Sequence, residues 1–88
     1  MDKHYILGVH ITDRVKNASE VQKTFTQYGC NIRTRIGLHH VDDKICSPNG
    51  LILVEVFGDQ AVCDEMMGKL SGIAGVEVQR MIFDHPDD

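Results

Sequence analysis

Stretches of alternating and of helically spaced hydrophobic residues follow one another along the whole chain. Alternation predicts strands over His4 to Asp13, Asn31 to Val41, Leu51 to Phe57 and Val76 to Phe83. Spacing of three and four predicts helices over Ala18 to Tyr28 and Gln60 to Leu70. The order strand, helix, strand, strand, helix, strand is typical of the split β-α-β, or ferredoxin-like, arrangement. The pattern therefore predicts one α+β domain over residues 1–88, a four-stranded antiparallel sheet with two helices on one face.

Alternation also assigns each strand position to one face of the sheet. In the first strand the residues expected to face the helices are Tyr5, Leu7, Val9 and Ile11. In the second strand the same rule turns Ile32, Thr34, Ile36 and Leu38 toward the helices and Arg33 and Arg35 away from them. The usual spatial order of this fold places the third strand between the first and the second. Asn17 or Ser19 is expected to cap the first helix.

The sheet face turned away from the helices is predicted to be too apolar for a solvated surface. The residues that we expect there are His10, Leu51, Leu53, Phe57, Met81 and Phe83. A contiguous apolar patch on a small domain usually marks an interaction surface. We therefore expect two such faces to pack together in a homodimer or a larger homo-oligomer such as a tetramer. The alternative is that these are ordinary scattered apolar residues on a protein surface.

Composition narrows the classes of partner. The chain has nine Lys and Arg against thirteen Asp and Glu, a formal charge of -4, so direct nucleic-acid binding is not expected. The sequence has no secretory leader and no apolar run of membrane-spanning length. Its three cysteines form no CxxC pair, which favours free thiols in a reducing cytoplasm. We expect a cytoplasmic protein that does not bind a membrane.

Metal ligation has one local candidate in the sequence. His40 and Cys46 are joined by a short segment that also holds Asp42 and Asp43. Histidine with thiolate suits zinc, nickel or copper, and further ligands would have to come from a partner subunit. The alternative is an ordinary surface histidine and a loop thiol.

Catalytic chemistry has weaker support. No spacing fixes two carboxylates at one site, and the sequence contains no phosphate loop or glycine fingerprint, so we expect a non-enzymatic protein without a cofactor. Cys63 lies among apolar helix positions and is expected to be a buried small hydrophobe. Arg33 and Arg35, on one predicted face, could hold an anion or simply form a solvated strand face.

Three segments resemble a known family. The chain resembles the small stand-alone iron-only hydrogenase system regulators in the segments ITDRVKNASEVQKTFTQYGCNIRTRIGLHH, GLILVEVFGD and LSGIAGVEVQ. That family is similar to the effector domain of the nickel-responsive repressor and to ACT regulatory domains. The resemblance implies a cytoplasmic, non-enzymatic, oligomeric sensor or transcriptional or hydrogenase-system regulator without a DNA-binding segment of its own.

The relatives also suggest sites. His40 and Cys46 keep the spacing of the last two nickel ligands of the repressor, whereas Leu38 stands where its first histidine would be. ACT domains bind small molecules at the turn between the first strand and the first helix. Asp13 and Arg14 match the start of that turn, and we expect a small-molecule effector near them and Asn17 at a subunit interface. The leading expectation is a homo-oligomeric regulatory or ligand-sensing module that acts on an effector or a protein partner. The alternative is a transition-metal-binding module that uses His40 and Cys46 at a subunit interface.

Overall fold

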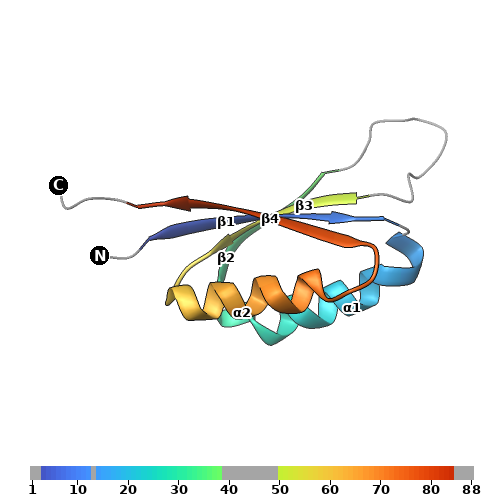
Figure 1. Cartoon of the computed structure of the whole chain (residues 1–88), viewed down its shortest axis with the longest axis horizontal. Coiled ribbons are helices and arrows are strands. Elements are labelled where there is room, and N and C mark those ends of the chain that lie inside the picture. Colours follow the sequence, from blue (N-terminus) through green and yellow to red (C-terminus); the bar gives the residue numbers. More distant parts are fainter. Residues whose placement is uncertain (1–2, 13, 39–49, 85–88) are drawn as a thin grey trace.

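A computed structural model describes residues 3–12, 14–38 and 50–84 of the chain. The elements are β1 (His4–Ile11), α1 (Arg14–Gln27), the short 3-10 turn η1 (Gly29–Asn31), β2 (Ile32–Leu38), β3 (Gly50–Val56), α2 (Gln60–Ser71) and β4 (Val76–Phe83). The strands form one antiparallel sheet in the order β2-β3-β1-β4, and both helices lie against the same face of it (Figure 1). The predicted ferredoxin-like α+β fold is confirmed, and so is the place of the third strand between the first and the second.

The core lies between the sheet and the two helices. Every second residue of β1 points into it, and Leu7 and Val9 are fully buried. The other buried hydrophobic residues are Tyr5, Ile11, Val21, Phe25, Tyr28, Val54, Val56, Cys63, Met66 and Leu70. Removing an aliphatic side chain of this kind from water stabilises the fold by about 1.5–3 kcal/mol. β1 and β3 are the two inner strands of the sheet, and β1 buries more side chains than β3 does.

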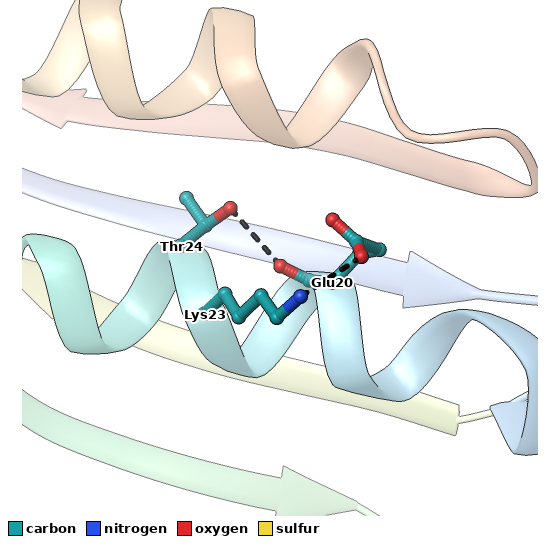
Figure 2. A network of polar contacts seen from close by, with 3 residues as sticks. All are labelled: Glu20, Lys23 and Thr24. Carbon is teal, nitrogen blue, oxygen red and sulfur yellow. Dashed lines mark hydrogen bonds and ion pairs between the residues drawn. The ribbon is translucent and has the colours of Figure 1, made fainter.

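Helix α1 begins at Arg14, four residues earlier than the apolar spacing predicts. Its first turn has a single apolar residue, Val15, which is too little to reveal a hydrophobic period. Because Asn17 and Ser19 lie inside the helix, the prediction that one of them is the N-terminal cap is wrong. Farther along the helix, the buried hydroxyl of Thr24 donates to the carbonyl of Glu20 at 3.2 Å (Figure 2). That backbone acceptor satisfies a hydroxyl that would otherwise be costly to bury.

Strand β2 contains a β-bulge, and the bulge overturns the predicted facing of most of this strand. Ile32 stands opposite Val56, but the next residue in register, opposite Glu55, is Thr34. Arg33 is the extra residue, so the alternation shifts by one position after it. Thr34 and Ile36 consequently stand opposite Glu55 and Leu53, away from the helices, whereas Arg35 and Gly37 stand opposite Val54 and Ile52. Of Ile32, Thr34 and Ile36, which were all expected to face the helices, only Ile32 does so, and the side chain of Leu38 lies outside the described part of the strand.

The contacts of the two arginines agree with this shift. The guanidinium carbon of Arg35 lies 4.9 Å from the centre of the Phe25 ring of α1, on the helix-covered side. The guanidinium carbon of Arg33 instead lies 5.2 Å from the centre of the Phe57 ring. The two side chains therefore do not share one face, and the structure does not bring them together as a pair that could hold an anion.

Candidate functional site

The sheet face opposite the helices is called here the open face. Its members lie on all four strands and comprise Ile6, Gly8, His10, Thr34, Ile36, Leu51, Leu53, Glu55, Glu77, Gln79, Met81 and Phe83. In Figure 1 the two helices lie on one side of the sheet, and no described helix or strand lies on the other. Met81 is 53% and Ile36 49% exposed, values that are high for large apolar side chains. The open face therefore presents apolar surface to the surroundings.

All of the residues predicted for the oligomer surface belong to this region. His10, Leu51, Leu53, Met81 and Phe83 stand on the open face by register. Phe57 follows buried Val56 directly after β3 and is 38% exposed. Two further apolar residues of this face were not predicted for the oligomer surface. Alternation assigned Ile6 to this face without including it in that surface, and Ile36 was assigned to the other face because the bulge was not foreseen. That the residues predicted for this surface mediate self-association stays a prediction.

The centre of the open face is hollowed. The hollow has a volume of about 370 Å³ and is lined by Ile6, Gly8, His10, Leu51, Leu53, Glu77, Gln79, Arg80 and Met81. Gly8 lies on β1 and stands between Leu53 of β3 and Gln79 of β4. Because it has no side chain, it leaves a depression between the larger residues around it. Ile6, Leu51, Leu53 and Met81 supply apolar surface, and His10, Glu77 and Gln79 add polar groups.

A polar cluster surrounds Glu55 of β3, on the side of the face that borders the edge strand β2. Its carboxylate accepts a hydrogen bond from the hydroxyl of Thr34 at 3.0 Å and lies 3.9 Å from the guanidinium of Arg33. The Arg33 guanidinium also covers the ring of Phe57. This arrangement neutralises Glu55 and joins β2 to β3 beside the bulge. The polar groups of this cluster are therefore used in contacts with one another between β2 and β3.

A second charged cluster lies on the helix-covered side. Arg80 of β4 bonds the carboxylate of Asp64 on α2, and its guanidinium lies 3.9 Å from the sulfur of Cys63. These two bonds raise the pKa of Arg80, and burial raises the pKa of the Cys63 thiol despite the opposing influence of Arg80. Burial also raises the pKa of Tyr5. A thiol in this state is a poor nucleophile, which agrees with the prediction that Cys63 is a buried hydrophobe.

The turn between β1 and α1 is tied to the turn that precedes β4. The Thr12 backbone N–H and side-chain hydroxyl both donate to the carbonyl of Gly75, each at 2.8 Å. The side-chain amide of Asn17 donates to the carbonyl of Thr12 at 2.9 Å. Gly75 has φ +79°, and a Cβ there would lie 2.7 Å from the Asn17 amide nitrogen. Glycine is therefore required by both conformation and space.

This geometry bears on the predicted effector site at the same turn. Asn17 already has an intramolecular acceptor, so its amide serves the turn itself. Arg14 is the first residue of α1. Asp13 lies outside the described residues, and the structure leaves a ligand site near Asp13, Arg14 and Asn17 as a prediction.

The predicted metal ligands, His40 and Cys46, also lie outside the described residues. Within 3–12, 14–38 and 50–84 no three His, Cys, Asp or Glu side chains gather as a metal site would need. Over the same ranges, no helix has the length and apolar character needed to cross a bilayer.

Comparison with known proteins identifies the fold but no function. No family model and no curated protein matches the chain. An uncharacterized protein, TM1266 from Thermotoga maritima, is similar in structure with a TM-score of 0.81 and 24% identity, over 96% of this chain and 100% of that one. An unknown protein from Galdieria sulphuraria matches with a TM-score of 0.59 and 11% identity, over 99% of this chain and 48% of that one.

One structural neighbour is an enzyme. A formyltetrahydrofolate deformylase from Pseudomonas putida matches with a TM-score of 0.54 and 13% identity, over 89% of this chain. The chain spans 28% of the deformylase, so only a portion of that protein is compared. At these identities the similarities concern the fold alone. The chain therefore has a small ferredoxin-like fold shared over its length with an uncharacterized protein and, in part, with larger proteins.

Proposed function

We propose that this protein is a non-enzymatic regulatory module that self-associates through the open face of its sheet. The observation that carries the proposal is the apolar character of a sheet face that no described helix covers. Exposed Ile36, Met81 and Phe83 would lose contact with water if a second sheet packed on them. Because the hydrophobic effect scales with the apolar area removed from water, such packing is favourable.

The size of the open face suits a small specific interface. Four strands at about 4.8 Å spacing and about seven residues at about 3.3 Å each span roughly 19 by 23 Å. Two such faces in contact would bury on the order of 1,000 Å² once side-chain relief is included, near the lower limit for specific interfaces. A face-to-face dimer is therefore an interface of modest affinity, as expected for an assembly whose state a ligand can change.

The distribution of charge on the face is compatible with self-packing. The negative charge of Glu55 is paired with the guanidinium of Arg33, so two copies would not bring unpaired Glu55 carboxylates together. On the two inner strands Ile6 and Leu53 flank Gly8, and Met81 stands beside Ile6 on the edge strand β4. Interfaces commonly combine apolar side chains with polar groups in this way.

The non-enzymatic and regulatory parts of the proposal have other support. Cys63 and Arg80, which have perturbed pKa values, bond each other on the helix-covered side, where they stabilise the contact between α2 and β4. The regulatory role derives from the resemblance to hydrogenase-system regulators and to ACT domains. A module of this kind would act by changing its oligomeric state when an effector or a protein partner binds.

Sedimentation velocity on the full chain tests the self-association. We expect the wild-type protein to sediment as a dimer or a larger species at tens of micromolar. Ile36→Lys and Met81→Lys each place a charge on the open face and are expected to weaken association by about tenfold or more. Gln22→Lys adds the same charge to an exposed position of α1 and is the matched control.

The proposal is wrong if the wild-type protein stays monomeric at several times that concentration. It is also wrong if Gln22→Lys dissociates the oligomer as strongly as the two open-face variants. Far-ultraviolet circular dichroism of each variant establishes that the fold is intact, so a change in sedimentation can be assigned to the interface.

A further inference from the structure

The hollow at the centre of the open face exists because residue 8 is glycine. An added Cβ at Gly8 would lie 3.8 Å from Leu53 Cδ2 and 3.9 Å from the Gln79 carbonyl oxygen, both ordinary contact distances. The glycine thus leaves accessible space and does not avoid a clash. The volume of about 370 Å³ falls in the range of roughly 300–1,000 Å³ that is usual for small-molecule sites.

One side of the hollow has a defined polarity. His10 and Glu77 are cross-strand partners, and the Gln79 amide donates to the Glu77 carboxylate at 3.5 Å. Among the described residues that line the hollow, Glu77 supplies the only carboxylate. Arg80 also contributes to the lining, but its guanidinium bonds Asp64 on the helix-covered side. The side chains facing the hollow therefore favour a cation or a strong hydrogen-bond donor.

We propose that this hollow binds a small ligand with an apolar body and an ammonium or similar cationic N–H group. The apolar body lies over Gly8 against Ile6 and Leu53, and the cationic nitrogen donates to Glu77 beside His10. The ligand class follows from the shape and charge of the lining. This inference deepens the proposed function and rests on it, because it makes the hollow the effector site.

A second copy of the chain completes this site. The hollow is open on the side away from the sheet, whereas small-molecule sites usually bury about 70–90% of the ligand surface. A second sheet packed on the open face would cover the exposed side of the ligand. Because the ligand then contacts both copies, its binding favours the associated state over the monomer by mass action.

Two small molecules that differ chiefly in charge test the ligand class. Phenethylamine has an aromatic ring and an ammonium group, and phenylacetate has the same ring with a carboxylate. Titration calorimetry on the full chain is expected to show millimolar or tighter binding of phenethylamine and at least about tenfold weaker binding of phenylacetate. Sedimentation velocity is expected to show more association with phenethylamine present.

Variants of the lining test the location. Gly8→Val fills the hollow, and Gly8→Ala fills it less while keeping ordinary contact distances. We expect graded losses of phenethylamine affinity, about tenfold or more for valine. Glu77→Gln is expected to remove most of the preference for phenethylamine over phenylacetate. Glu65→Gln removes an exposed carboxylate from α2 and should change neither binding nor preference.

The outcomes separate this inference from the proposed function. If the protein associates but phenethylamine does not bind, or binds equally to the Gly8→Ala, Gly8→Val and Glu77→Gln variants, the ligand inference is wrong and self-association stands. Equal binding of phenylacetate overturns the charge assignment. If the wild-type protein is monomeric with and without phenethylamine, self-association fails first, and closure of the site by a second copy fails with it.

Discussion

Arg80 shows how one charged residue is accommodated on the buried side of a sheet. It lies on β4 opposite core residue Leu7, yet its guanidinium reaches the Asp64 carboxylate of α2. The same guanidinium bonds the sulfur of Cys63, which is fully buried. The aliphatic part of an arginine can cover apolar surface while its charged end stays near solvent. Arg80 therefore stabilises the contact between β4 and α2 both through its aliphatic part and through its ion pair with Asp64.

The Cys63 thiol predicts a loss of stability in alkali. Burial raises its folded-state pKa above the ordinary value of 9.0, so the unfolded chain loses this proton at a lower pH than the folded one. The stabilisation is complete below about pH 9 and is lost as the pH rises through the folded pKa. We expect the free energy of unfolding, measured with urea at constant ionic strength, to fall above about pH 9.

Comparison with variants assigns this effect to the buried thiol. In Cys63→Ala the fall should begin near pH 10, where the buried Tyr5 begins to contribute with the same sign because its pKa is also raised. Cys30→Ala removes an exposed thiol and should keep the wild-type pH profile. An unchanged profile in Cys63→Ala would contradict the assignment.

At the scale of elements, the bulge in β2 decides which side chains the two faces receive. It sends Ile36 to the open face and Arg35 to the helices. The guanidinium carbon of Arg35 then lies 4.9 Å from the centre of the Phe25 ring of α1. One extra residue thus both enlarges the apolar open face and adds a contact between the edge strand and a helix.

A double-mutant cycle between Arg35 and Phe25 tests this facing. Arg35→Ala, Phe25→Leu and the double variant should give a coupling energy of about 0.5–1 kcal/mol, the usual size of a cation–π contact. The cycle of Arg33→Ala with Phe25→Leu is the control, and we expect no coupling because Arg33 covers Phe57. Urea unfolding measures each free energy. Equal couplings in both cycles would mean that Arg35 does not occupy the helix-covered side.

β1 is well predicted from sequence because its hydrophobic alternation is regular. Alternation assigns Leu7 and Val9 to the core and Ile6 and His10 to the open face, as the structure has them. The error in β2 has a specific cause, since an inserted residue leaves the hydrophobic pattern plausible on either face. The start of α1 was missed because Val15 is the only apolar residue among residues 14–17 and shows no helical period by itself.

At the scale of the whole molecule, the sheet has one face covered by helices and one without such cover. Leu7 and Ile6 are neighbours on β1 and point to opposite faces of the sheet. Leu7 lies in the monomer core, so its contribution to stability does not require a second copy. Ile6 lies at the proposed interface, where its contribution should depend on association. Substitutions at Leu7 and at Ile6 should therefore report separately on the stability of the folded monomer and on the stability of the assembly.

Leu7→Ala and Ile6→Ala should differ in how their effects depend on protein concentration. We expect Leu7→Ala to lower the free energy of unfolding by about 2–5 kcal/mol at every concentration, a large part of the stability of a domain of this size. Ile6→Ala should cost less in dilute protein and more as the concentration rises, because it weakens the associated state. Urea unfolding at two protein concentrations measures both. A concentration-independent effect of Ile6→Ala would contradict its place at an interface.

Local pattern alone determined the order of the elements, the ferredoxin-like fold and the apolar character of the open face, because hydrophobic period depends only on residues near one another in the chain. Tertiary structure decided the facing of Ile36, the hollow over Gly8 and the link between Asn17, Thr12 and Gly75. Each of these depends on register between strands or on turns brought together from distant parts of the chain. Such relations arise only when the sheet forms, because pairing across strands places residues that no local spacing relates.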